Sequence, residues 1–111
     1  MNQTELLQEF DVTCTKLRTI LEAKNSDYAQ SSDGGDPFAN FTACEKLDLC
    51  HAEVGLLIRM LDKWQRLKTL AKIGKLSVKG ESGVDACFDL MGYSFLMLAL
   101  LKYKEQNVRT S

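Results

Sequence analysis

The chain of 111 residues is poor in the residues that interrupt helices and in several that build reactive sites. It has one proline, one histidine and a formal net charge of −1. Because proline is nearly absent and apolar residues recur at helical spacing, we predict an all-α protein. A charge near zero gives no general signature of nucleic-acid binding, so nucleic acid is not an expected partner. The length fits a single domain over residues 1–111.

The four cysteines also lack a metal-binding pattern. They are Cys14, Cys44, Cys50 and Cys87. No pair has C-x-x-C spacing, which disfavours a zinc site, and three fall on apolar helix faces as small hydrophobes. The first residues, MNQTELLQEF, do not resemble a signal peptide, and the longest apolar run is too short to span a membrane and contains Asp89. We therefore expect reduced thiols, a cytoplasmic protein without a membrane partner, and a structural role for His51.

Apolar periodicity divides the chain into helices and loops. The first predicted helix covers residues 3–24, with Thr4 as its cap, and a loop over 25–36 follows it. A short helix then starts at Asp36-Pro37, and a long helix runs from a capping box at Thr42–Glu45 to about Ile73. After a loop over 74–81, the last helix starts with Ser82 as its cap and ends near 103–105. We expect an antiparallel bundle of three long helices and one short helix. Because the last helix is apolar on nearly all sides, oligomerisation is expected to complete the bundle.

The last helix carries acids in an unusual place. Glu81, Asp85 and Asp89 recur every four residues and so lie along one stripe, and no Lys or Arg occurs between Glu81 and Leu101. A carboxylate buried without a partner costs several kcal/mol, so it must be protonated, hydrogen-bonded or bound to a cation. Three acids in a row favour a divalent metal. The competing interpretation is that Glu81 and Asp85 lie in a solvated first turn, where the helix dipole favours acids.

The long helix adds a fourth acid, Glu53, which its apolar neighbours predict to face the core. Two antiparallel helices would bring Glu53 to the acids of the last helix, and Mg²⁺ or Mn²⁺ prefers such oxygen ligands. The predicted metal ligands are Glu53, Glu81, Asp85 and Asp89. The basic residues after it, among them Arg59, Lys63 and Arg66, either bind phosphates or form a solvated face. Arg66 also follows Asp62 by four residues, the spacing of a surface ion pair.

The predicted loop after the first helix starts with Lys24, Asn25, Ser26, Asp27 and Tyr28. Lys24 would hold a phosphate, Asn25 and Asp27 would contact a base or sugar, and Tyr28 would stack. The competing interpretation is ordinary turn chemistry after a helix that ends in lysine.

Three segments in order, KNSDY (24–28), RMLDKWQRL (59–67) and ESGVDACFDLMGY (81–93), resemble a known family. It is the phage-associated nucleotide-modification-associated domain, a small helical family, and the chain is more distantly similar to MazG-type all-α nucleoside triphosphate pyrophosphohydrolases. The resemblance implies a dimer or tetramer that binds Mg²⁺ and a nucleoside triphosphate, in the host cytoplasm if a phage encodes it. The chain departs from the E-x-x-E pattern, because Leu56 follows Glu53 by three.

These residues lead to three hypotheses. The first is a Mg²⁺-dependent pyrophosphohydrolase that releases a nucleoside monophosphate and pyrophosphate, with Glu53 and Asp85 as catalytic residues. Its predicted nucleotide-binding residues are Lys24, Asn25, Asp27, Tyr28, Arg59, Asp62, Lys63, Arg66 and Tyr93. The second is a non-catalytic protein that sequesters a nucleotide or a cyclic nucleotide. The third is a structural homo-oligomer.

Overall fold

A computed structural model describes residues 1–29, 38–75 and 82–110, which form four α-helices and no strand. The chain is all-α, as predicted. It divides into two compact units, Met1–Ala39 and Asn40–Ser111, and each is described by itself.

The first unit contains helix α1, which spans Gln3–Ala29. Its start is capped reciprocally, because the Glu5 amide donates to Oδ1 of Asn2 at 2.8 Å and the Asn2 amide donates to Oε2 of Glu5 at 3.2 Å. The prediction that Thr4 caps this helix is therefore wrong. The predicted loop is wrong for residues 25–29, which continue the helix because they contain no glycine or proline. The rest of that loop lies outside the described residues, as does the predicted Asp36-Pro37 helix start.

The predicted long helix from residue 42 is two helices. Helix α2 spans Ala39–Lys46, and helix α3 spans Ala52–Ile73. Between them the Leu49 amide donates to the Cys44 carbonyl at 2.9 Å, and Asp48 takes a left-handed conformation with φ of 57°. A left-handed residue just past the last turn is a common way for a helix to end, and aspartate tolerates it better than most residues.

The ends of the remaining helices follow familiar capping chemistry. Helix α3 ends as predicted at Ile73, followed by Gly74 in the left-handed conformation at φ of 87°. Helix α4 spans Gly83–Thr110. The Asp85 amide donates to Oγ of Ser82 at 3.0 Å, which confirms Ser82 as the cap. The helix continues past the predicted end near 103–105.

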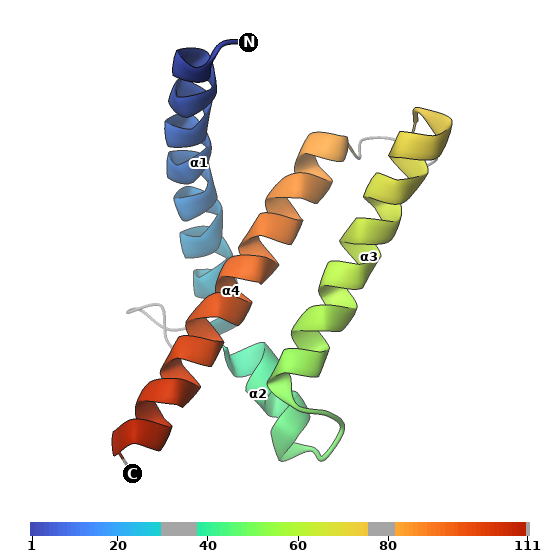
Figure 1. Cartoon of the computed structure of the whole chain (residues 1–111). Coiled ribbons are helices and arrows are strands. Elements are labelled where there is room, and N and C mark those ends of the chain that lie inside the picture. Colours follow the sequence, from blue (N-terminus) through green and yellow to red (C-terminus); the bar gives the residue numbers. More distant parts are fainter. Residues whose placement is uncertain (30–37, 76–81, 111) are drawn as a thin grey trace. The chain divides into compact units, whose positions relative to one another are not determined.

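Helices α3 and α4 lie side by side and run antiparallel (Figure 1). The start of α4 approaches the end of α3 so closely that a Cβ atom at Gly83 would overlap the side chain of Leu70. The buried apolar residues of this unit are Phe41, Ala52, Leu56, Ala86 and Leu100. Phe41 of α2 packs near Gly55 of α3, and the Arg59 guanidinium lies over its ring at 5.6 Å.

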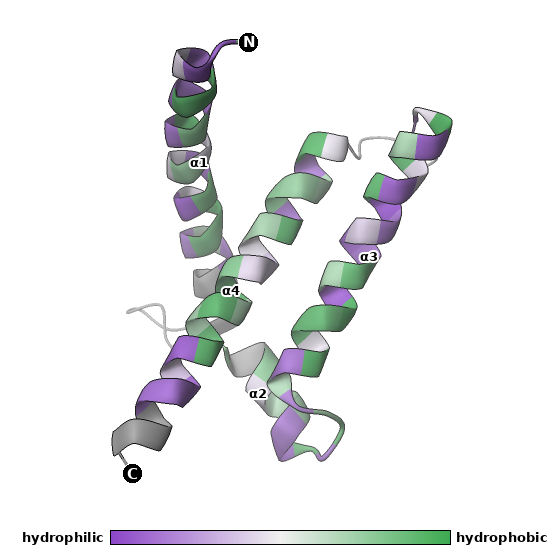
Figure 2. Ribbon diagram, in the orientation of Figure 1, coloured by the Kyte–Doolittle hydropathy of each residue, from purple (hydrophilic) through white to green (hydrophobic). Residues whose placement is uncertain are grey.

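Both long helices of this unit also expose an apolar stripe on the side opposite their shared contact. The stripe of α3 consists of Val54, Leu57, Leu61 and Trp64, and that of α4 consists of Val84, Met91, Phe95 and Leu98; these residues are 37 to 62% exposed. Leu57 and Trp64, which flank Glu53 on the predicted helix face, thus belong to an exposed stripe. Figure 2 shows hydrophobic residues over most of the length of α4, with polar residues toward its C-terminal end.

Within α4, the segment Gly83–Gln106 has a length and a mean hydropathy, 1.6, that would allow it to cross a membrane. The prediction that no segment is long enough does not hold for this helix. Only 11% of its most apolar window is buried in the described structure, where α4 packs one side against α3.

Candidate functional site

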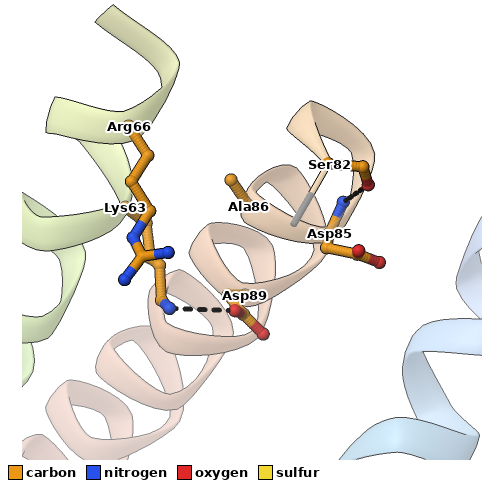
Figure 3. Close-up of a pocket in the computed structure, with 6 residues that line it drawn as sticks. All are labelled: Lys63, Arg66, Ser82, Asp85, Ala86 and Asp89. Carbon is orange, nitrogen blue, oxygen red and sulfur yellow. Dashed lines mark hydrogen bonds and ion pairs between the residues drawn. The ribbon is translucent and has the colours of Figure 1, made fainter. Parts of the chain in front are cut away.

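A hollow of about 60 Å³ lies where the last turns of α3 meet the first turns of α4 (Figure 3). Its lining residues are Lys63, Arg66, Ser82, Asp85, Ala86 and Asp89. The two basic residues come from α3 and the two acids from α4. Segments more than fifteen residues apart in the sequence therefore contribute opposite charges to one small site.

Helical spacing explains this arrangement. Lys63 and Arg66 are three residues apart on α3, and Asp85 and Asp89 are four residues apart on α4, so each pair projects from one side of its helix. Ala86 lies between the two acids on the buried side of α4, and its small side chain leaves room for the hollow. The Ser82 cap fixes where α4 starts and therefore where Asp85 lies.

The charges in the hollow balance each other across the two helices. The Lys63 ammonium lies 3.2 Å from Oδ2 of Asp89 and 3.7 Å from Oδ2 of Asp62, and Nε of Arg66 lies 3.4 Å from the same Asp62 oxygen. The last contact confirms the ion pair predicted from spacing. Figure 3 shows Lys63 and Arg66 reaching toward α4, whereas the exposed Asp85 carboxylate points away from both.

The ion pair with Lys63 explains how the apolar helix α4 accommodates the Asp89 carboxylate. The side chains of Lys63 and Asp89 are only 19% and 28% exposed. The partner of Asp89 is thus a lysine of the neighbouring helix, which the absence of basic residues near Asp89 in the sequence concealed.

Glu53 lies at the other end of the helix pair. Its Oε1 accepts a hydrogen bond from Nζ of Lys104 at 2.6 Å. Lys104 follows Asp89 by 15 residues on α4 (104 − 89), which is about 22 Å along a helix that rises 1.5 Å per residue. The expectation that the antiparallel helices bring Glu53 to Asp85 and Asp89 therefore does not hold within one chain, because Glu53 starts α3 whereas those acids start α4.

Around Glu53 a second polar cluster joins three helices. Oε1 of Glu45 in α2 accepts from the Ala52 amide at 2.8 Å and from Lys104 at 3.4 Å. The Ala52 hydrogen bond, followed by the charge of Lys104, lowers the pKa of Glu45 below its ordinary 4.5. The hydrogen bond to Glu53 raises the pKa of Lys104 above its ordinary 10.5. The sequence pattern had assigned Glu45 to a capping box at the start of one long helix.

The other predicted site residues lie apart from the hollow or outside the described side chains. Arg59 contacts Phe41, and Tyr93 is half-buried on α4. Lys24 is half-buried on α1. The remaining positions are Asn25, Asp27 and Tyr28, whose backbone is helical but whose side chains lie outside the description, and Glu81, which lies outside the described residues.

The acids of the hollow suit a metal that completes its shell with other ligands. Among the described residues, no three His, Cys, Asp or Glu side chains lie close enough to hold a metal ion by themselves. Asp85 and Asp89 are neighbours on one helix face. Mg²⁺ is often held by one or two carboxylates together with waters and substrate phosphates. Asp85 and Asp89 are the two carboxylates of the hollow that could serve a metal in this way.

The hollow thus combines two basic side chains from α3 with two carboxylates from α4. Comparison with protein-family models, with curated proteins and with solved structures finds no match to this chain, so the assignment of the site depends on its own geometry and on the residues that form it.

Proposed function

We propose that the protein is a Mg²⁺-dependent nucleotide-binding protein of the nucleoside triphosphate pyrophosphohydrolase type. The observation that carries this proposal is the meeting of Lys63 and Arg66 with Asp85 and Asp89 around one hollow. The resemblance to the nucleotide-modification-associated domain supports it, because two of the three resembling segments, 59–67 and 81–93, supply these four residues.

Each side chain has a role that follows from its charge. Lys63 and Arg66 contact phosphate oxygens, and the planar guanidinium of Arg66 can bind two of them at once. Asp85 and Asp89 would hold the metal once the Asp85 side chain turns toward the hollow. When bound, Mg²⁺ neutralises phosphate oxygens and activates a water for attack on a phosphoanhydride. Binding of a phosphate to Lys63 competes with its ion pair to Asp89, which releases that carboxylate for the metal.

The size of the hollow limits which part of a nucleotide it accepts. About 60 Å³ is room for a few water molecules, each of which needs about 10–15 Å³ of such space. A phosphoryl group can occupy such a space, whereas a base and ribose would extend beyond it. The proposed site therefore recognises the phosphate end of the substrate, and base selection belongs to residues outside the hollow.

The direct test is a melting-temperature screen of dNTPs and NTPs with Mg²⁺, followed by an assay for pyrophosphate release. A nucleotide at about 100 times its Kd stabilises the folded state by about 2.7 kcal/mol. We expect Lys63→Gln to weaken binding about 10- to 100-fold, since a hydrogen bond to a charged group contributes about 1.5–3 kcal/mol. Lys72→Gln is the matched control, because it removes the same charge from an exposed position of α3.

Variants of the acids separate the two ends of the helix pair. We expect Asp89→Asn and Asp85→Asn to abolish the Mg²⁺-dependent part of the response, and Glu53→Gln to retain it. Loss of the response in Glu53→Gln but not in Asp89→Asn would contradict the proposed site. No melting shift and no turnover with any nucleotide tested would contradict the proposed function.

A second candidate function is nucleotide binding without hydrolysis, as in a protein that sequesters a nucleotide or a cyclic nucleotide. The observation that favours it is the separation of Glu53 from the hollow, which leaves Asp85 and Asp89 as the acids that line it. A melting shift that survives chelation of Mg²⁺ and that yields no product would support this candidate over the first.

We also propose that the chain is a homodimer or homotetramer in the cytoplasm. The exposed apolar stripes of α3 and α4 support this partner, because large exposed apolar surfaces mark protein–protein interfaces. A structural homo-oligomer without a ligand remains the third candidate, and it predicts that no nucleotide changes the melting temperature.

A further inference from the structure

A pair of cysteines lies at the junction of α2 and α3, away from the proposed nucleotide site. Cys44 is in the last turn of α2, and Cys50 is in the turn that precedes α3. The Cys50 amide donates to the Cys44 carbonyl at 3.4 Å, so the backbone turn brings these two cysteines next to each other. Both residues are partly exposed and neither is in a disulfide.

We propose that Cys44 and Cys50 are a redox-sensitive dithiol, which a peroxide converts to an intramolecular disulfide that locks the α2–α3 junction. The observation is that a backbone hydrogen bond across a short turn joins two partly exposed cysteines, neither of which is in a disulfide. This inference is independent of the proposed nucleotide function.

The chemistry needs only the peroxide and the two thiols. The thiolate of one cysteine attacks a peroxide oxygen, the O–O bond breaks, and a sulfenic acid and a hydroxide form. The second cysteine attacks the sulfenic sulfur, an S–S bond forms, and the sulfenic oxygen leaves as water. The two thiol protons appear in two molecules of water. Each sulfur loses one electron, and hydrogen peroxide is reduced by two.

The surroundings of Cys50 slow its oxidation at neutral pH. Burial, and next the neighbouring Cys44, raise the pKa of the Cys50 thiol. The other titratable groups near this turn are Glu45, Asp48 and His51, which line a hollow together with Cys50. The reactive form of a cysteine is the thiolate, so a raised pKa slows oxidation at neutral pH and makes its rate increase with pH.

The disulfide would act on the contact that starts α3. Glu45, which follows Cys44, accepts a hydrogen bond from the Ala52 amide, and Ala52 lies two residues after Cys50. A disulfide between Cys44 and Cys50 would fix the turn that separates Glu45 from Ala52. The hydrogen bond between these two residues would then break less often. The unfolded chain also loses freedom when a loop is closed, which stabilises the folded state.

The test uses the full chain with Cys14→Ser and Cys87→Ser, because those two exposed cysteines could form disulfides between molecules. Treatment with hydrogen peroxide is expected to remove both remaining thiols, to lower the mass by two hydrogen atoms, and to give a peptide in which Cys44 and Cys50 are linked. The melting temperature is expected to rise by about 10–20 °C, since closing a loop of this length stabilises the folded state by about 2.4 kcal/mol. Exchange of the Ala52 amide should slow.

Two single variants in the same background are the controls. With Cys44→Ser or Cys50→Ser, peroxide should yield a sulfenic acid or its further oxidation products, without the melting shift. The proposal is overturned if the parent protein gains oxygen at both cysteines without forming the link, or if the link forms only between molecules. It is equally overturned if the link forms and leaves both the melting temperature and Ala52 exchange unchanged.

Discussion

At the scale of single residues, two side chains act differently from what their sequence neighbourhood indicates. Glu45 does not close a capping box at its own helix but caps the next helix, and Lys104 near the end of α4 bridges Glu45 and Glu53. His51 at the N-cap position of α3 makes no side-chain hydrogen bond to the helix start. Glu45 therefore supplies the acceptor that an N-cap side chain usually supplies.

The Glu45 cap gives a prediction about acid stability. A carboxyl whose folded pKa is lowered contributes stability above its unfolded pKa, and that contribution is lost as the pH falls through the folded value. We expect Glu45→Gln to melt below the parent protein at pH 7. The difference should disappear as the pH falls below 4.5, because the parent carboxyl then becomes protonated as well. Equal melting temperatures at pH 7 would contradict the cap.

Lys104 gives the opposite pH dependence. Its folded pKa is raised, so its contribution is complete below the ordinary value of 10.5 and is lost as the pH rises through the folded value. Because the Lys104 side chain is 42% exposed, solvent screens the pair, and we expect Lys104→Met to lower the free energy of unfolding by only about 0.5 kcal/mol. Urea unfolding at low and high salt would measure this difference, which high salt should reduce.

Gly55 offers a stabilising substitution. It lies inside α3, and a Cβ atom there would meet the Phe41 ring at 3.5 Å, an ordinary contact. Alanine has a higher helix propensity than glycine, so Gly55→Ala should raise the free energy of unfolding by about 0.5–1 kcal/mol. Urea denaturation would measure the gain. A loss of stability would mean that the ring cannot accommodate the added methyl group.

At the scale of elements, the sequence predicted helix type well and helix boundaries less well. The ends at Ile73 and Ser82 were predictable because glycine and a capping serine mark them. The break after Lys46 was not, because apolar residues such as Leu47 and Leu49 continue a helical spacing that suggested one helix. What ends α2 is the left-handed Asp48, a conformation that aspartate permits but does not require.

The turn between α2 and α3 can be tested through Asp48. Glycine adopts positive φ without a steric penalty, whereas a β-branched residue does not. We expect Asp48→Gly to maintain or raise stability and Asp48→Val to lower it by about 1–2 kcal/mol. Thermal unfolding of the two variants would show opposite shifts. A neutral Asp48→Val would indicate that the turn takes another conformation.

At the scale of the whole molecule, α3 and α4 each have two apolar sides, of which one packs within the pair and the other is exposed. The sequence predicted an apolar helix that needs partners. The sequence predicted Asp62, Lys63 and Arg66 on one helix, and Asp85 and Asp89 on another, as site residues, and the spacing along each helix places each set on one face. It could not predict that Glu53 lies at the opposite end of the pair, because the offset between two helices is set by packing and not by the period of either.

The exposed stripes predict the behaviour of the protein in solution. If the stripes join copies of the chain, Phe95→Glu on α4 or Leu61→Glu on α3 should convert an oligomer to a monomer in analytical ultracentrifugation. Lys46→Gln is the control, because it changes the net charge by the same amount at an exposed position of α2. A parent protein that sediments as a monomer, or that partitions to lipid vesicles, would contradict the proposed homo-oligomer.

The two ion pairs between α3 and α4 also encode the direction in which the helices run. Helix α3 contributes Glu53 from its first turn and Lys63 from its middle, while α4 contributes Asp89 near its start and Lys104 near its end. A parallel alignment with Glu53 beside Asp89 would set two carboxylates against each other, and like charges repel. The four charged residues thus favour the antiparallel orientation.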